Sequence, residues 1–419
     1  MSDRKRIYLC LAHMSEAGLE QKYIQEAFDT NWVVPLGPNV NAFEKDLESF
    51  VGQNKRVVAL SSGTAAVHLA LINCGVKQGD EVIVQSFTFC ASSHPITYLG
   101  ATPVFVDSEK DTWNMDPELL EKAIIDRKAK TGKYPKAIVP VALYGMPYQI
   151  DRIMEIANKY DIPVIEDAAE GFGSRFNGRV LGTFGKYGVL SFNGNKIITT
   201  SGGGALITNS DDEWREIMMY ATQYRESYPY YQHEKIGFNY RLSNVCAGIG
   251  RGQMAILDDH IAHHKKVQKM YEELLKDVKG IKLHSQPATG EYDSNYWLIT
   301  ITLDPDLKIK GQENAYKTIV KGAVGGAAGV IHMADSATTD CQPNYNVEAL
   351  RVFMDAAQIE ARPVWKPMHK QPCYKDAPAY VNGVSESIFK VSMCLPAGPC
   401  VSEDDVRYIV ECIKEAIEK

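Results

Sequence analysis

Residues 56–75, RVVALSSGTAAVHLALINCG, join a short apolar run to a helical pattern through the turn SSGT. The run RVVAL at 56–60 is rich in β-branched residues and predicts a strand. The stretch AAVHLALINCG predicts a helix, because a Ser or Thr of the turn can cap its first backbone amides and Gly75 suits its end. This strand–turn–helix unit is typical of an α/β sheet in which helices connect parallel strands.

The same alternation continues along the chain. The strands expected after the first are nearly continuously apolar, as in a sheet covered by helices on both faces. They lie at 81–86, 103–107, 137–143, 163–167 and 187–192, with helical patterns at 116–126 and 149–161 between them. We therefore predict a mostly parallel central sheet flanked by helices, within a large domain at 1–255.

The pattern changes after about residue 255. A long charged helix around 256–278, a strand at 295–303 and a terminal helix predict a smaller C-terminal α+β domain at 256–419. The terminal helix carries one apolar stripe formed by Val406, Ile409, Val410, Ile413 and Ile417, which predicts a packed core face. Residues 311–345 are rich in Gly and Ala without a clear period, and we expect an inserted loop with a short helix there.

Composition restricts the class of protein. The 419 residues are 45% hydrophobic and 23% charged, with a formal net charge of -7, so no basic surface for nucleic acid is expected. The nine cysteines form no C-x-x-C pair, no metal site is predicted, and reduced thiols are expected. No apolar run approaches the roughly 18 residues of a membrane helix. We predict a cytoplasmic protein that binds neither nucleic acid nor membrane.

A lone lysine, Lys196, lies in SFNGNKIITTSGGGALIT at 191–208. It could be an exposed turn residue, a phosphate-binding charge or a covalent catalyst. The β-branched neighbours argue against an exposed turn, and the phosphate-loop pattern G-x-x-x-x-G-K-[ST] is not matched. A helix terminus stabilises an anion by only about 0.3–2 kcal/mol, so a non-covalent contact holds a ligand without new chemistry. An imine between the lysine and a cofactor can stabilise a carbanion, which amino-group transfer requires.

Other strand ends supply what a pyridoxal phosphate enzyme needs besides that lysine. Ser62, Gly63 and Thr64 combine small hydroxyls with a helix N-terminus that suits a phosphate. Asp167 ends an apolar strand, where a carboxylate normally needs a cationic or hydrogen-bonding partner, and a protonated pyridine would be such a partner. For the ring face, Phe87 and Phe89 follow a strand and either side chain could reach a ligand.

Seven segments occur together in one order: SSGTAAVHLAL, SFTFCAS, GATPVFVD, PVIEDAAEGFGS, GVLSFNGNKIITTSGGGALIT, GFNYRLSNVCAGIGRGQM and RPVWKPMHKQP. This order resembles the DegT/StrS-type sugar aminotransferases over about residues 8–310 and 355–415. The resemblance implies fold type I, pyridoxal 5'-phosphate as cofactor with pyridoxamine 5'-phosphate as intermediate, and residues 1–40 as a segment that lines the cleft. It also implies a homodimer that binds an amino-acid donor, expected to be glutamate, and a keto sugar nucleotide.

The resemblance assigns roles to individual positions. Lys196 becomes the Schiff-base lysine and Asp167 the partner of the pyridine nitrogen. The remaining cofactor contacts are Ser62, Gly63, Thr64, Phe89, Ser191, Asn193 and Asn239, of which Asn239 reaches the cofactor of the neighbouring subunit. The substrate contacts are Glu170, Arg362 and His369.

The sequence at Asn193 and Gly194 differs from the S-F-H-P of many family members. Glu170 stands where many members have histidine or glutamine. The segments SFNGNKIITTSGGG and KPMHKQP are similar to those of the subgroup that aminates C4 of UDP-4-keto-6-deoxy-N-acetylglucosamine, on the route to bacillosamine-type sugars. Amination at C3, a dTDP carrier and a non-catalytic cofactor-binding sensor remain open. A nucleotide-dependent oxidoreductase is disfavoured, because no dinucleotide fingerprint is present.

Overall fold

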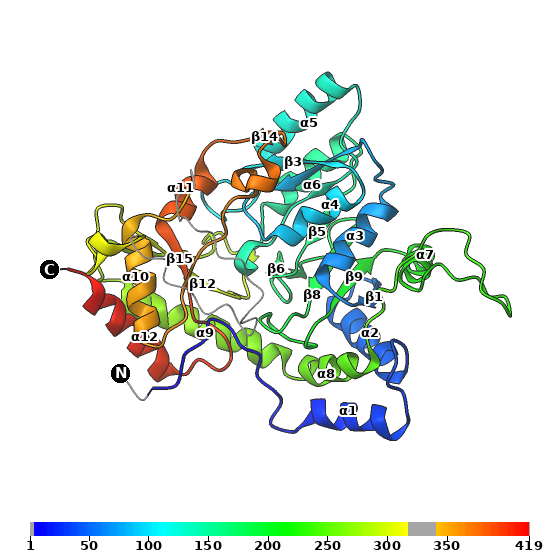
Figure 1. The fold of residues 1–419 in the computed structure, drawn as a ribbon, viewed down its shortest axis with the longest axis horizontal. Coiled ribbons are helices and arrows are strands. Elements are labelled where there is room, and N and C mark those ends of the chain that lie inside the picture. The colour runs from blue at the N-terminus through cyan, green and yellow to red at the C-terminus, as the bar shows by residue number, and fades with distance from the viewer. Residues whose placement is uncertain (1–3, 317–340, 419) are drawn as a thin grey trace.

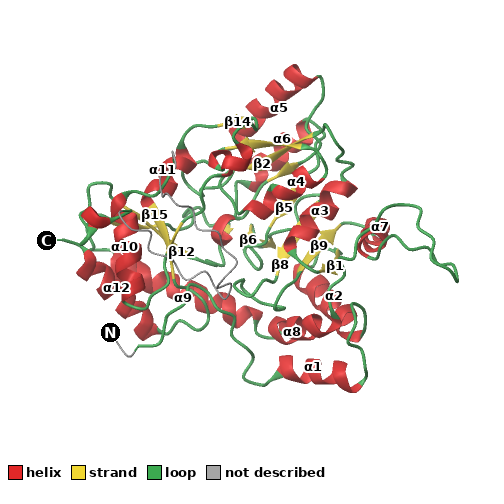
Figure 2. Cartoon of the chain, in the orientation of Figure 1, coloured by secondary structure: helices red, strands yellow, loops and turns green. Residues whose placement is uncertain are grey.

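A computed structural model describes residues 4–316 and 341–418. A central sheet and a second, smaller sheet lie side by side, each flanked by helices (Figures 1 and 2). The central sheet has the order β14-β3-β2-β4-β5-β8-β9-β1, in which parallel bridges from Ile138 to Val164 and from Val141 to Asp167 join β4 to β5. All neighbouring strands are parallel except β9, which runs antiparallel to both β8 and β1. The mostly parallel sheet of the prediction is therefore confirmed.

The strands of this sheet lie close to the predicted positions. Their bounds are β1 Arg56–Leu60, β2 Glu81–Gln85, β3 Thr102–Val106, β4 Ile138–Val139, β5 Ile165–Asp167, β8 Tyr187–Ser191, β9 Gly204–Thr208 and β14 Ala379–Tyr380. The expectation of a strand over 137–143 was too long. Pro140 has no backbone N–H for the ladder, and a 3-10 turn, Leu143–Gly145, begins soon afterwards.

Alternation along each strand divides the apolar side chains between two cores. Val57 of β1 and Ile83 of β2 face one core, whereas their neighbours Val58 and Val84 face the other. The first core is covered by α2 (Pro38–Val51), α5 (Pro117–Thr131) and α6 (Ile150–Lys159), and the second by α3 (Gly63–Asn73), α4 (His94–Tyr98) and α7 (Asp211–Ala221). Burial on both faces explains why the strands read as continuous apolar runs.

The second sheet has the antiparallel order β10-β12-β15-β13 and its own core. Its strands are β10 Ile281–Leu283, β12 Ile299–Leu303, β13 Arg362–Pro363 and β15 Ser392–Leu395, and its helices are α9 Leu257–Leu275, α10 Tyr345–Ala356, α11 Val384–Val391 and α12 Glu403–Ala416. The expected stripe of α12 is buried, except that Ile417 lies one residue beyond the helix. Ile7 also belongs to this core, and β14 belongs to the central sheet, so the division at 255/256 stays a prediction.

The remaining elements connect these two parts. Helices α1 (Leu19–Asp29) and α8 (Asn244–Met254) pack together beside α2, and a small sheet contains β6 (Arg175–Phe176), β7 (Arg179–Val180) and β11 (Tyr292–Asp293). The segment that follows α7 projects away from the body (Figure 1). Of the insertion expected at 311–345, residues 317–340 lie outside the described part of the chain. The described part begins with the 3-10 turn Gln312–Asn314.

Candidate active site

A cavity of about 340 Å³ opens at the carboxyl ends of the parallel strands. Ligands bind at this edge in open α/β sheets, because the loops that follow the strands converge there. The cavity gathers most of the residues that the sequence singled out, namely Ser62, Gly63, Thr64, Phe89, Asp167, Glu170, Ser191, Asn193 and Lys196. Segments from 61 to 203 therefore meet at one point of the fold.

The N-terminus of α3 forms one wall of the cavity. Ser62 is its N-cap, and the Ser62 hydroxyl accepts the backbone N–H of Ala65 at 3.0 Å. Gly63 lies so close to β8 that a Cβ there would approach the Cβ of Ser191 to 3.1 Å. Across the sheet, a Cβ on Gly204 would lie 2.4 Å from the backbone nitrogen of Gly63. Glycines thus let β9 and α3 pack backbone to backbone, which leaves free amides facing the cavity.

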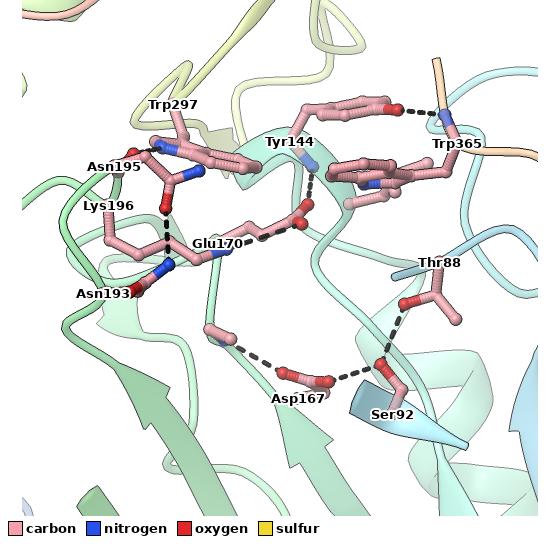
Figure 3. A network of polar contacts seen from close by, with 12 residues as sticks. Thr88, Ser92, Tyr144, Asp167, Glu170, Asn193, Asn195, Lys196, Trp297 and Trp365 are labelled. Carbon is pink, nitrogen blue, oxygen red and sulfur yellow. Dashed lines mark hydrogen bonds and ion pairs between the residues drawn. The ribbon is translucent and has the colours of Figure 1, made fainter. Parts of the chain in front are cut away.

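Asp167 is the last residue of β5 and is only 5% exposed. Its carboxylate accepts a hydrogen bond from the Ser92 hydroxyl at 2.6 Å and another from the backbone N–H of Ala169 at 3.1 Å (Figure 3). Burial raises the pKa of Asp167, whereas these hydrogen bonds and the charge of Lys196 lower it. A buried carboxylate that lines a cavity with two neutral donors is suited to a cationic ligand group.

Lys196 follows β8 in a tight loop, where its backbone N–H donates to the carbonyl of Asn193 at 2.9 Å. The side chain is only 13% exposed, so Lys196 is not a solvated turn residue. Its Nζ atom lies 3.7 Å from Oε1 of Glu170 and 3.9 Å from the centre of the Trp297 ring (Figure 3). The amine therefore lies inside the cavity and within reach of a ligand there.

Glu170 is buried beside this amine. One of its oxygens accepts the backbone N–H of Tyr144 at 2.7 Å. Burial raises the pKa of Glu170, and the positive charge of Lys196 opposes that shift most strongly. The site thus contains two buried carboxylates, Asp167 and Glu170, and one lysine, Lys196.

Aromatic side chains form the outer wall. Phe87 is fully buried in the core, whereas Phe89 is 48% exposed and lines the cavity. The ring of Phe89 lies 5.3 Å from that of Trp365, and the Trp365 backbone N–H donates to the Tyr144 hydroxyl at 2.7 Å. Of the two phenylalanines left open by the sequence, only Phe89 can meet a ligand.

Comparison with known proteins identifies the family to which the chain belongs. A sequence model described as the DegT/DnrJ/EryC1/StrS aminotransferase family matches residues 15–322 and 312–414. The chain belongs to this family. It is therefore a pyridoxal phosphate-dependent aminotransferase of fold type I.

Two relatives and one solved structure illustrate the similarity. The aminotransferase is 42% identical over 413 residues to EpsN of Bacillus subtilis (strain 168), which carries the name of a pyridoxal phosphate-dependent aminotransferase; the match covers 98% of this chain and 95% of EpsN. It is 32% identical over 410 residues to the GDP-perosamine synthase of Escherichia coli O157:H7, covering 97% and 98%. A crystal structure of a DegT DnrJ EryC1 StrS aminotransferase from Brucella abortus superposes with a TM-score of 0.80 at 28% identity, covering 96% of each chain.

The cavity of the aminotransferase fits the family's cofactor. The N-terminus of α3, with its glycine cradle, offers amides and hydroxyls for a phosphate, and Asp167 offers a buried carboxylate for a ring nitrogen. Among the described residues that line this cavity, Lys196 alone supplies an amine. Each chemical requirement of pyridoxal phosphate thus has a matching group within one enclosure.

The structure places three predicted residues of the aminotransferase outside this cavity. Arg362 is exposed and pairs with Glu360 at 2.5 Å. The His369 ring contacts the Ser86 hydroxyl at 2.6 Å at the end of β2. Asn239 is exposed next to the projecting segment, where a second subunit would have to meet it. Their roles stay predictions.

Several residues that line or support the cavity were not predicted from the sequence. Trp297 and Trp365 line it, and Ser92 and Tyr144 hold the two carboxylates. Trp365 lies within the quoted motif RPVWKPMH, so this motif could have indicated it. The resemblance assigned substrate contacts to Arg362 and His369 of the motif instead. In the described part of the chain no cluster of His, Cys, Asp or Glu could hold a metal ion, and no helix is long and apolar enough to cross a membrane.

Proposed function

We propose that this aminotransferase transfers an amino group from an amino acid, glutamate by family resemblance, to the keto group of a sugar nucleotide. In this proposal Lys196 is the residue that bonds to the cofactor and carries the proton. The observation that carries it is the convergence of Lys196 and Asp167 from two different strand ends into one cavity walled by the start of α3. Relatives named as sugar-nucleotide enzymes support the substrate class.

The residues of the chain divide the chemical work. When bound, pyridoxal phosphate supplies an electron-accepting ring conjugated to the amino group that is transferred. The carboxylate of Asp167 keeps a proton on the ring nitrogen, because a buried anion strongly favours a positive partner. With the cofactor bound, the Nζ atom of Lys196 would take the proton from the α-carbon of the amino donor and hold it for return later in the reaction. Phe89 and Trp365 exclude water from the reacting atoms.

The expected sugar substrate is UDP-4-keto-6-deoxy-N-acetylglucosamine, aminated at C4. The segments SFNGNKIITTSGGG and KPMHKQP support this choice, because they resemble those of the subgroup that acts on this sugar. Amination at C3 and the carriers dTDP and GDP are the alternatives, and GDP enters because of the name of the Escherichia coli relative. Mass spectrometry of products from glutamate and a panel of UDP-, dTDP- and GDP-keto sugars decides the carrier, and NMR then locates the amine.

We further propose that the active unit is a homodimer in which Asn239 completes the partner's phosphate site. The projecting segment supports this arrangement, since it exposes Tyr228, Tyr230 and Tyr231 to 52%, 62% and 77%. Mixing the Lys196→Ala and Asn239→Ala proteins tests it. If the site is shared, mixed dimers regain one intact site and part of the activity; if the mixture stays as inactive as its components, the shared site is wrong.

The assignment of Lys196 has a direct test. The Lys196→Ala protein should lose both turnover and the visible absorbance of a cofactor bonded to lysine. Asp167→Ala should lose most activity while still binding some cofactor, because the carboxylate affects the ring more than it anchors the phosphate. Retention of the absorbance or of turnover by Lys196→Ala would refute the assignment.

A further inference from the structure

The amino group of Lys196 lies against two buried side chains, those of Trp297 and Glu170. Nζ lies above the ring face of Trp297, 3.9 Å from its centre, and 3.7 Å from Oε1 of Glu170 (Figure 3). An aromatic face attracts a cation through its quadrupole, and the attraction is strongest where water is excluded. Trp297 is 1% exposed and Glu170 4% exposed, so both contacts are shielded.

Asn295 fixes the positions of Glu170 and Trp297 relative to each other. The side-chain amide of Asn295 donates to the backbone carbonyl of Glu170 at 3.0 Å, and its oxygen accepts the backbone N–H of Trp297 at 2.8 Å. Gly145 makes room for it, because a Cβ at this position would lie 1.8 Å from that oxygen. The indole N–H of Trp297 in turn donates to the carbonyl of Asn195, the neighbour of Lys196, at 2.6 Å. Hydrogen bonds at the backbone and at the indole N–H of Trp297 therefore position its ring relative to Glu170 and to the loop of Lys196.

We propose that Trp297 and Glu170 form a holding site for the free amino group of Lys196. The inference rests on the proposed role of Lys196. Whenever an incoming ammonium group takes the place of Lys196 on the cofactor, its nitrogen forms the new bond to carbon as the bond to Nζ breaks. The protons that the incoming nitrogen loses are gained by Nζ, so charge is conserved and no oxidant or reductant is required. The released ammonium then moves onto the Trp297 face.

The holding site makes displacement of Lys196 by an amine more favourable. A desolvated contact between a cation and an aromatic ring corresponds to roughly a 30-fold change in an equilibrium constant. Loss of the ring face should therefore shift the equilibrium back towards bonded Lys196 by at least about tenfold. A phenylalanine keeps a ring face but loses the indole N–H, so Trp297→Phe and Trp297→Leu separate the two functions of the side chain.

The first experiment measures this equilibrium in the holoenzyme. The probe is α-methyl-L-glutamate, which can displace Lys196 but has no α-proton to lose, so no transamination follows. Absorbance titration should give an apparent dissociation constant raised at least about tenfold in Trp297→Leu and by less than about threefold in Trp297→Phe. Trp113→Leu, which removes another buried tryptophan outside the cavity, should bind the probe as the unmodified enzyme does.

The second experiment uses the protein without cofactor. Labelling of Lys196 by an amine-reactive reagent, followed by mass spectrometry, should be several-fold faster in Trp297→Leu, because the ammonium loses its shielding ring. If labelling is unchanged, or if both Trp297 variants change equally in the titration, the holding site is refuted. A weaker titration with unchanged labelling would mean that Trp297 contacts the donor instead. If the unmodified enzyme ignores the probe, glutamate is the wrong donor, and the labelling alone decides the holding site.

Discussion

The three consecutive glycines at 202–204 should respond very differently to alanine. Gly204 begins β9 and pairs with Leu60 on one side and Ser191 on the other. A Cβ at Gly204 would lie 2.4 Å from both the nitrogen of Gly63 and the carbonyl carbon of Ser62. At Gly202, by contrast, a Cβ meets no atom within 4 Å.

The magnitude follows from these distances. Real Cβ contacts are essentially never shorter than 3.0 Å, so the start of α3 must move by about 0.6 Å relative to β9 in Gly204→Ala. The clashing atoms belong to the backbone, so no side-chain rotation can relieve them. Overpacking of this kind costs about 1–3 kcal/mol in the free energy of unfolding. Because the phosphate site is built on the same turn, we also expect cofactor affinity to fall about tenfold or more.

Two measurements check this reasoning. Guanidinium denaturation of the proteins without cofactor gives the free energy of unfolding, and absorbance titration with pyridoxal phosphate gives the affinity. Gly202→Ala is the matched control and should lie within about 0.5 kcal/mol of the unmodified protein. The packing argument is wrong if Gly204→Ala is as stable as Gly202→Ala and binds the cofactor equally well.

Two further predictions concern buried charge. Arg241→Met should destabilise the protein by about 3–5 kcal/mol, because it leaves the buried carboxylate of Glu44 without its ion-pair partner. Burial already raises the pKa of Glu44, so the loss in free energy of unfolding should grow as the pH rises above 4.5 in denaturation curves. A Glu44→Gln, Arg241→Met double variant should lose less free energy of unfolding than Arg241→Met alone. His264 is buried with its pKa lowered to about 3, so its contribution to stability is present above pH 6.5 and is lost as the pH falls towards 3. A His264→Gln protein should show a shallower acid-side slope, and an unchanged slope would contradict the burial argument.

The parts of the fold that depend on local signals could be predicted from the sequence. Both apolar faces of β1 and β2, the cap at Ser62 and the burial of the α12 stripe follow from short-range periodicity and turn chemistry. The convergence of Lys196 and Asp167 also follows, since parallel strands bring their carboxyl ends to one edge.

The residues that escaped prediction depend on contacts between distant segments. Trp297 enters the cavity from the loop that precedes β12, and nothing in SNYWLIT distinguishes a cavity tryptophan from a core one. Arg362 and His369 were assigned as substrate contacts from the resemblance alone, and in the structure both have local partners: Glu360 pairs with Arg362, and Ser86 contacts His369.

The choice between Phe87 and Phe89 shows where strand reasoning ends. Side chains two residues apart point the same way only while the backbone stays extended. β2 ends at Gln85, and the backbone N–H of Thr88 already donates to the carbonyl of Ser86 at 3.1 Å, which turns the chain between the two rings. Phe87 therefore enters the core and Phe89 faces the cavity. Strand ends locate a site reliably, but the turn that follows each strand decides which side chain enters it.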